Sequence, residues 1–265
     1  MKKIEQKETR ERTIIRYKNG IKIQTDDIIV NETTITISVQ CQNLGTITCT
    51  PSNLYDLATG YLISSGIVWA KNKLIHIDFI EDENKFDVTL ENNKILVDTD
   101  YDIVKPTGCA SGDMLFTKVI HNKIKTGDVE IKSVEILALM QEFNKTSELF
   151  RATGGVHSSA ISDNKKILVF REDIGRHNAV DKVIGAMYRN KMKLEDKILL
   201  TSGRISSEIV LKSINAGIQM IISRSAPTLK GIELAEENNI AVVGFARSNN
   251  FNIYSCFNKV VFDDL

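Results

Sequence analysis

The chain has 265 residues, of which 42% are apolar and 26% are charged, the composition of an ordinary globular protein of one or two domains. The 34 Lys and Arg residues balance 34 Asp and Glu residues, so the basic excess of a duplex nucleic-acid binder is lacking. No stretch approaches the ~18 apolar residues of a membrane helix, and no apolar signal segment follows the charged N-terminus. The four cysteines form no CxxC pair, and a disulfide framework is not expected at this density. We therefore expect a cytoplasmic protein with neither nucleic-acid nor membrane partners.

Residues 13–97 have a pattern that favours strands. Apolar and polar residues alternate over 33–39, and 74–80 and 86–90 look similar, as half-buried strands should. One helix is expected after Pro51, because apolar residues between 54 and 62 recur at helical spacing. We predict a smaller, β-rich N-terminal subdomain over residues 1–105.

The second half alternates helices with short apolar strands. The predicted helices cover 131–143, 177–189, 206–216 and 227–237, and the predicted strands cover 167–170, 197–200, 218–222 and 240–243. This alternation is typical of a mainly parallel sheet covered by helices, here an α/β domain over 131–265. Weak periodicity and four Gly or Pro residues between 98 and 127 predict a connector, placed at 106–130, that carries Cys109.

Three successive predicted strand ends each present one arginine: Arg204, Arg224 and Arg247. Ligands of open α/β sheets bind beyond the carboxyl ends of the strands, where helix N-termini and Arg hold phosphate oxygens. The alternative is that the Ser, Gly and Pro residues of these loops only cap helices, with Pro227 opening one of them. Because three adjacent loops share the same chemistry, we favour an anion-binding site.

Two histidines and one cysteine are further candidates. His177 begins a predicted helix in the segment REDIGRHN, and His157 follows a Gly-Gly pair; each could serve the site or only the structure. No metal site, and hence no zinc, is expected, because Arg176 beside His177 opposes a cation and no second ligand stands at metal-binding spacing. Cys109 lies between glycines, and as a reactive thiol it would need a lowered pKa.

Taken together, these residues resemble the formate dehydrogenase accessory sulfurtransferases, the FdhD family. The resemblance covers about residues 45–254. The matching blocks, in order, are Cys49-Thr50-Pro51, 151–157, 171–181, Ser202-Gly203-Arg204, 225–228 and 244–247.

The resemblance implies a cytidine-deaminase-like three-layer α/β core with a smaller N-terminal β-rich subdomain, and a homodimer. It implies a sulfurtransferase that carries sulfur as a cysteine persulfide from a cysteine desulfurase to the molybdenum or tungsten bis-pyranopterin guanine dinucleotide cofactor, as formate dehydrogenase activity requires. The catalytic cysteine falls on Cys109. The cofactor-binding run near the C-terminus falls on Phe245, Ala246, Arg247, Ser248, Asn249 and Asn250. Further contacts to this cofactor, or to GDP as its partial mimic, are expected from Arg204, Arg224, Arg176, His177 and His157.

One departure from the family pattern matters. Many members carry CxxC in this segment, whereas Gly112 stands at the second position here, so a single thiol must suffice. The H-x-E and PCxxC ligand sets of zinc deaminases are lacking, so deamination is not expected. A non-catalytic chaperone that binds and hands over the cofactor, with Cys109 incidental, remains the main alternative.

Overall fold

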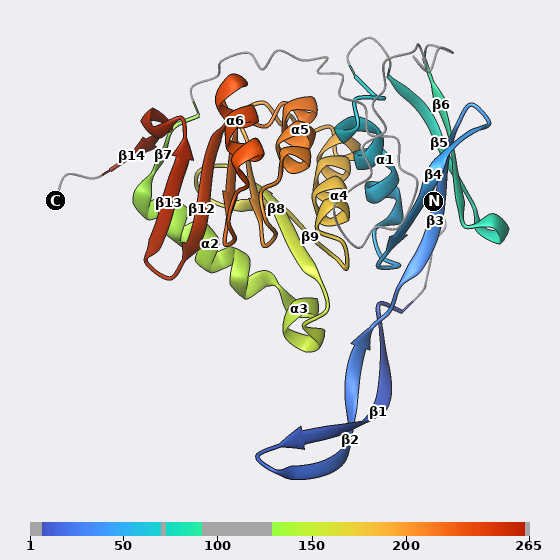
Figure 1. Ribbon diagram of the computed structural model, residues 1–265. Helices are drawn as coiled ribbons and strands as arrows, with labels where there is room; N and C mark the ends of the chain where they lie inside the picture. Colours follow the sequence, from blue (N-terminus) through green and yellow to red (C-terminus); the bar gives the residue numbers. More distant parts are fainter. Residues whose placement is uncertain (1–6, 70–72, 92–128, 263–265) are drawn as a thin grey trace.

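The computed structural model describes residues 7–69, 73–91 and 129–262. Within them the chain is mixed α/β, with six α-helices and four sheets (Figure 1). Cys109 and most of the predicted connector lie outside these residues, and the predicted domain boundaries stay a prediction.

The N-terminal part contains a projecting hairpin and a four-stranded sheet. The hairpin pairs β1 (Thr9–Lys18) with β2 (Ile21–Val30), and it leads away from the body (Figure 1). The sheet has the order β4-β3-β6-β5. Its strands are β3 (Thr33–Val39), β4 (Gln42–Cys49), β5 (Leu74–Ile80) and β6 (Lys85–Leu90). The strands predicted at 33–39, 74–80 and 86–90 are confirmed, as is the helix after Pro51, α1 (Leu54–Ser64).

A six-stranded sheet in the order β13-β12-β11-β10-β8-β9 forms the centre of the second part. Its strands are β8 (His157–Ser162), β9 (Ile167–Asp173), β10 (Ile198–Thr201), β11 (Met220–Ser223), β12 (Ala241–Arg247) and β13 (Asn250–Ser255). Only β10–β11 and β11–β12 pair in parallel, and the other three pairings are antiparallel, so the prediction of a mainly parallel sheet is wrong. The sequence hid β8 and β13 because both are rich in Ser or Asn, which rarely mark strands.

Five helices and a short strand pair complete this part. The helices are α2 (Ser133–Thr146), α3 (Glu148–Thr153), α4 (Arg176–Arg189), α5 (Ser207–Ala216) and α6 (Leu229–Glu237). The pair joins β7 (Ile131–Lys132) to β14 (Val260–Val261). The four predicted helices are confirmed in α2, α4, α5 and α6. Pro227 does not open α6, however: it bridges to Ile205, and Thr228 caps the helix by accepting a bond from the Gly231 N–H.

The six-stranded sheet is the middle of three layers. Ile198 and Leu200 of β10 pack in the core on the α2 side, whereas Leu199 faces the core of α4 and α5. This alternation places α2 on one face and α4, α5 and α6 on the other, as Figure 1 shows. The three-layer arrangement is thus confirmed, while its likeness to cytidine deaminases stays a prediction.

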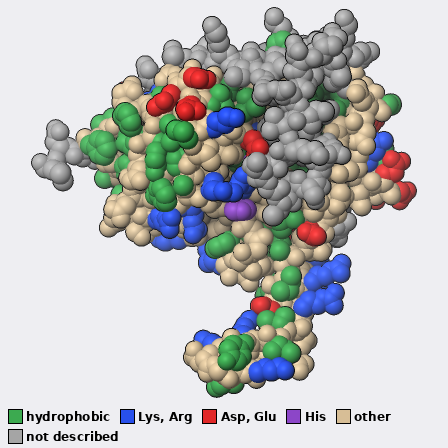
Figure 2. All heavy atoms as spheres, in the orientation of Figure 1, with side chains coloured by type: hydrophobic (Ala, Val, Ile, Leu, Met, Phe, Trp, Pro, Cys, Tyr) green, Lys and Arg blue, Asp and Glu red, His purple; other side chains and the backbone are tan. Residues whose placement is uncertain are grey.

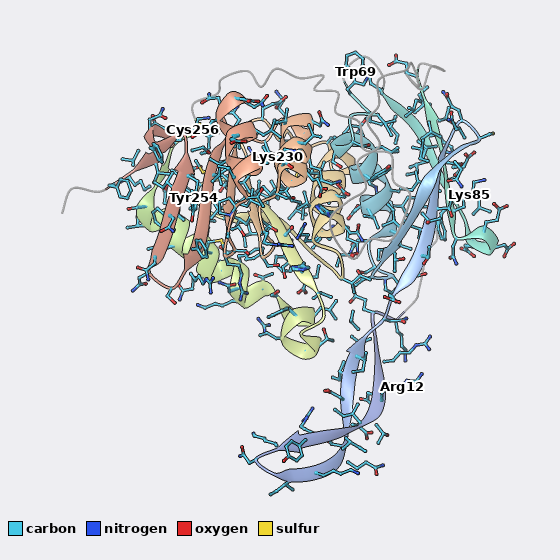
Figure 3. All side chains as sticks on the ribbon, viewed as in Figure 1. Arg12, Trp69, Lys85, Lys230, Tyr254 and Cys256 are labelled. Atoms are coloured by element: carbon cyan, nitrogen blue, oxygen red, sulfur yellow. The ribbon has the colours of Figure 1, made fainter. Side chains whose placement is uncertain are left out.

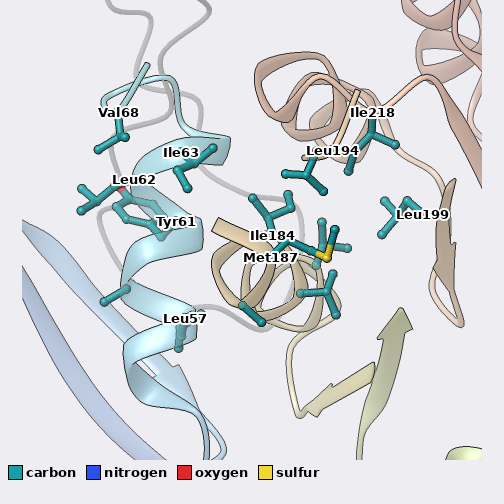
Figure 4. Close-up of a cluster of buried hydrophobic side chains, with 14 of the residues drawn as sticks. Leu57, Tyr61, Leu62, Ile63, Val68, Ile184, Met187, Leu194, Leu199 and Ile218 are labelled. Carbon is teal, nitrogen blue, oxygen red and sulfur yellow. The ribbon is translucent and has the colours of Figure 1, made fainter. Parts of the chain in front are cut away.

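Helices α1 and α4 join the two parts of the fold. Tyr61 of α1 and Ile184 and Met187 of α4 belong to one buried cluster that runs from the four-stranded to the six-stranded sheet (Figure 4). The helices approach closely because each has a glycine at the crossing. A Cβ at Gly60 would lie 1.7 Å from the Asp181 carbonyl oxygen, and one at Gly185 would lie 1.9 Å from that of Asp56.

Replacement of either glycine by alanine should therefore push the helices apart. We expect Gly185→Ala to lower the free energy of unfolding by about 3 kcal/mol or more, since overpacking at a backbone contact cannot relax through a side chain. Urea denaturation followed by circular dichroism measures this change. The control is Glu142→Ala on the exposed face of α2, where a change under about 0.5 kcal/mol is expected. Equal stability of the two variants would contradict the tight crossing.

Candidate functional site

The last residues of β9, β10 and β11 meet the first residue of β8 at one edge of the six-stranded sheet. β8 runs antiparallel to β9 and β10, so its first residue, His157, pairs with the last residue of β9, Asp173. The loops that follow β10 and β11 are joined by hydrogen bonds. Ser223 Oγ donates to the Gly203 carbonyl at 2.6 Å, and the Arg224 N–H donates to that of Thr201 at 3.3 Å. These bonds join the two loops, which are separated in the sequence, into one continuous surface.

A hollow of about 330 Å³, here called the site hollow, opens at this edge. Its lining consists of Phe150, Gly154, Gly155, Val156, His157, Ile174, Ser202 and Arg224. His157 Nδ1 lies 3.3 Å from Ser202 Oγ, which also accepts a bond from the Ser158 N–H at 3.0 Å. A hydroxyl that accepts there can donate to Nδ1, which fits a neutral His157 carrying its proton on Nε2.

The electrostatics of the site hollow also favour neutral His157. Burial lowers the pKa of His157, and positive charge on Arg176 and His177 lowers it further, against a smaller opposing effect of Asp173. Figure 2 shows a His among Lys and Arg side chains on the face in view. The neighbouring positive charge that disfavours a proton on the His157 ring also attracts an anion.

Arg224 connects the site hollow with a second one. Its guanidinium lies 5.8 Å from the centre of the Phe150 ring and donates to Asn144 Oδ1 of α2 at 3.2 Å. Asn144 lines the second hollow, here called the α2 hollow, of about 580 Å³. The α2 hollow is lined by Leu137, Ala138, Met140, Gln141, Asn144, Lys145, Arg151, Ser248 and Asn249. An arginine stacked on an aromatic ring between two hollows can hold a phosphate and leave a ring face for a planar base.

The structure brings together some of the predicted site residues and separates others. His157 and Arg224 line the site hollow, and Ser248 and Asn249 line the α2 hollow. Arg204 is exposed to solvent.

The two residues at the start of α4 lie beside or beneath the site hollow. The side chain of Arg176 packs against Gly203, where an added Cβ would lie 3.0 Å from Arg176 Cβ. His177 is buried, with Nε2 2.9 Å from Glu208 Oε2, and burial is the largest cause of its lowered pKa. His177 therefore fits an internal contact between α4 and α5.

The run 244–248 was expected as a loop, and this prediction is wrong. Phe245, Ala246 and Arg247 end β12, and Asn250 begins β13. The strand is irregular here, with register shifts against β13 and left-handed backbone at Phe245 and Ser248. Ala246 is buried, whereas Phe245 and Arg247 are exposed, with the guanidinium 5.6 Å from the Phe245 ring centre.

A carboxylate that the sequence did not single out positions Phe150. Glu172 accepts bonds from the Leu149 and Phe150 N–H groups, both at 3.0 Å, and from Ser147 Oγ at 2.9 Å. It thereby caps α3, a helix of one and a half turns that the sequence pattern did not reveal. In the sequence, the only indication of Glu172 was its position as one of the two adjacent carboxylates in REDIGRHN.

A buried ion pair fixes the loop behind the site hollow. Asp173 and Lys182 are both fully buried, and their charged atoms lie 2.7 Å apart. Asp173 also accepts bonds from Thr50, which follows β4, and from the Gly175 N–H at 2.9 Å. The neighbouring thiol of Cys49 is buried, and burial, helped by Asp173, raises its pKa to about 12.

In 7–69, 73–91 and 129–262, no group of three or more His, Cys, Asp and Glu side chains is arranged to hold a metal ion. No helix in those same ranges combines the length and apolar character needed to cross a membrane.

The lowered pKa of His157 makes a measurable prediction. The unfolded chain takes up its proton first as the pH falls through about 6.5, so the free energy of unfolding should fall below that pH. The NMR titration of His157 should have its midpoint below 6.5 and should move upward in Arg176→Gln, which removes one positive neighbour. Lys230→Gln on α6 is the control and should leave the midpoint unchanged. A midpoint at or above 6.5 in the unchanged protein would contradict the assignment.

The chain is similar throughout its length to proteins of one family. The FdhD/NarQ family model matches residues 30–261. The sulfur carrier protein FdhD of Bacillus licheniformis is 36% identical, covering 96% of this chain and 98% of that protein. That of Bacillus subtilis is 35% identical, covering 94% and 96%. In fold, a crystal structure from Desulfotalea psychrophila, named as that of a formate dehydrogenase accessory protein, gives a TM-score of 0.76 at 22% identity, over 96% of this chain and 99% of the other. These findings confirm the resemblance, and the chain belongs to the FdhD/NarQ family.

Proposed function

We propose that this protein is a sulfur carrier for the maturation of formate dehydrogenase. It takes sulfur from a cysteine desulfurase as a persulfide on Cys109 and passes it to the molybdenum or tungsten bis-pyranopterin guanine dinucleotide, which is its substrate. Membership of the family and the names of the relatives support the sulfur-carrying role. The structural observation that carries the proposal is the placement of Arg224 and Phe150 between two hollows.

The two hollows have the chemistry that a guanine dinucleotide needs. Arg224 and Arg151 offer guanidinium groups for phosphate oxygens, and the exposed Phe150 ring offers a face for stacking. Ser248 and Asn249 add polar groups from the run that the family resemblance assigns to the cofactor. Neutral His157 can donate a hydrogen bond from Nε2 without bringing another charge.

The sulfur step needs one thiolate. The Cys109 thiolate attacks the outer sulfur of the desulfurase persulfide, and the desulfurase cysteine leaves as a thiolate. Cys109 then carries the outer sulfur of a persulfide, and on delivery the S–S bond breaks, Cys109 returns to the thiolate, and the metal of the substrate accepts the sulfur as a neutral atom. A reducing cytoplasm, where free thiols persist, suits this chemistry, and we propose that the protein works there as a homodimer.

Replacement of Cys109 separates sulfur transfer from simple cofactor delivery. After incubation with a cysteine desulfurase and cysteine, the unchanged protein should gain ~32 Da on Cys109, one sulfur atom. Cys109→Ser should show no gain there and should fail to activate formate dehydrogenase in cells that lack the native protein. The exposed thiol of Cys41 provides the control, and Cys41→Ser should behave as the unchanged protein. Full activation by Cys109→Ser would instead establish the chaperone function.

Replacement of Arg224 tests the binding site. We expect Arg224→Ala to weaken GDP binding at least about tenfold, the loss of one charge-assisted hydrogen bond to phosphate. Isothermal titration calorimetry measures the affinity, with Lys230→Ala on α6 as the matched loss of one exposed cation. Cys109→Ser should bind GDP as the unchanged protein does. Unchanged affinity in Arg224→Ala would place the nucleotide elsewhere.

A further inference from the structure

One segment of the chain supplies most of the lining of the site hollow. Five of the eight lining residues belong to 147–157, here called the wall segment. It contains α3, with six residues, and a turn through Gly154 and Gly155 that leads into β8. An isolated helix of this length is not stable in water, so neighbouring parts of the chain must hold the wall segment in place. Glu172 does so from the side of the sheet, through the bonds that it accepts at the start of α3.

The turn of the wall segment is hydrogen-bonded to its helix. The Gly154 N–H donates to the Phe150 carbonyl at 2.7 Å, and the Gly155 N–H donates to Thr153 Oγ1 at 3.2 Å. His157 begins β8 two residues after Gly155. A displacement of the turn is therefore expected to reach both Phe150 and His157.

The second support of the wall segment comes from the base of the β1–β2 hairpin, here called the arm. β2 contacts α3, and residues 7–9 line a hollow of about 390 Å³ together with three residues of α3. The backbone N–H of Asn31 donates to the Glu8 carbonyl at 2.7 Å, and its side-chain amide donates to the Lys7 carbonyl at 3.1 Å. These bonds close the base of the arm next to the wall segment, whereas the outer part of the arm leads away from the body (Figure 1).

Val30, the half-buried last residue of β2, lies beside Gly155. A Cβ at Gly155 would lie 2.8 Å from Val30 Cγ1, well inside the distance of about 3.5–4.0 Å at which carbon atoms normally pack. Val30 has little freedom to turn aside, because a β-branched side chain is restricted at χ1. Unlike Gly154, Gly155 does not have left-handed backbone, so its conformation does not demand glycine. The space that Val30 occupies therefore accounts for the missing side chain at Gly155.

We propose that Val30 is a positioning residue for the site hollow, because it packs against Gly155 and so holds the wall segment in place. Val30 does not line the hollow, and its effect passes through the turn to Phe150 and His157. The base of the arm thus belongs to the binding site, although no residue of β1 or β2 lines the hollow. The inference rests on the proposed binding of a guanine nucleotide at this hollow, and it names a distant part of the chain that sets the affinity.

A double-mutant cycle between Val30 and Gly155 tests this coupling through the affinity for GDP. Gly155→Ala should weaken GDP binding at least about fivefold, because the added methyl group meets Val30 and displaces the turn. Val30→Ala should weaken it about two- to threefold, because the wall segment then loses a support. In a chain that already carries Val30→Ala, the further change Gly155→Ala should weaken binding less than about twofold, since space for the methyl group is then available.

Isothermal titration calorimetry measures the four affinities. Ile23→Ala, on the exposed outer part of β2, is the matched control and should bind GDP as the unchanged protein does. Trp69 is the one tryptophan of the chain and lies far from the arm, on which Arg12 is labelled (Figure 3). Its fluorescence in urea therefore confirms that each variant is folded without reporting the contact itself.

The ring of His157 gives a second measurement that needs no nucleotide. Gly155→Ala should shift the imidazole resonances of His157 in the NMR spectrum of the free protein, and Val30→Ala in the same chain should return them toward their original positions. If the unchanged protein bound no GDP, the nucleotide site would lie elsewhere, and the His157 resonances would still decide the role of Val30.

Three results would overturn the proposal. An equal loss of GDP affinity from Gly155→Ala with and without Val30→Ala would show that Gly155 acts independently of the arm. If Gly155→Ala left both the GDP affinity and the His157 resonances unchanged, the contact with Val30 would not set the wall segment. A loss in Ile23→Ala as large as that in Val30→Ala would assign the effect to the arm as a whole and not to its base.

Discussion

The contact between α1 and α4 holds the two halves of the molecule together, and a buried ion pair makes it specific. Asp181 of α4 and Lys212 of α5 are fully buried with their charges 2.7 Å apart, and Ser64 of α1 donates to Asp181 at 2.5 Å. Charges removed from water are tolerated only when each finds its partners, so a shift of any one helix leaves an unpaired charge in the core. The glycines of the crossing bring the helices close enough for these bonds. Hydrophobic burial supplies the driving force, and the ion pair selects one arrangement of three helices.

The same helix carries the second buried pair, which acts on the candidate site. Lys182 follows Asp181 directly, and successive helix residues point about 100° apart, so one side chain faces α5 and the next faces the end of β4. Through Asp173 and Thr50, Lys182 fixes the turn that leads into Arg176. The geometry around His157 therefore depends on the same packing that joins the two sheets. A variant that loosens α4 is expected to change both stability and the site.

The helices and strands that have a clear local hydrophobic pattern could be predicted from the sequence. Those that are defined only by their pairing or contact with a distant segment could not. Periodicity located α1, α4, α5 and the apolar strands, but β8 has a Ser-rich sequence and is recognised only by its pairing with β9 and β10. The loops after successive strands led to Arg224, because the rule on strand ends applies to β10 and β11 even in a mixed sheet. Phe150 and Asn144 come from two helices that meet Arg224 only in the folded chain, and no single-sequence pattern marks them. The burial of Lys182 and Lys212 is hidden from the sequence for the same reason, since the buried carboxylate that pairs with each is distant along the chain or unmarked by any pattern.

Because Gly112 stands in place of a second cysteine, the thiol of Cys109 must both accept the sulfur from the donor and pass it to the substrate in the proposed chemistry. The environments of the three thiols that the structure describes explain why none of them acts as a second carrier. Cys49 adjoins the site, but burial raises the pKa of its thiol to about 12, which disfavours the thiolate that would attack a persulfide. Cys256 donates to Asn239 Oδ1, and burial again raises its pKa. Cys41 is exposed but lies in the turn between β3 and β4, in a different sheet from β8, which begins at His157, and from β11, which the Arg224 loop follows. The environments of Cys49 and Cys256 favour the neutral thiol, and Cys41 lacks a site, so none of the three is a good relay. A single thiol must react first with the desulfurase and only afterwards with the nucleotide-bearing substrate. The persulfide on Cys109 therefore has to remain intact after the desulfurase has dissociated and until the substrate receives the sulfur.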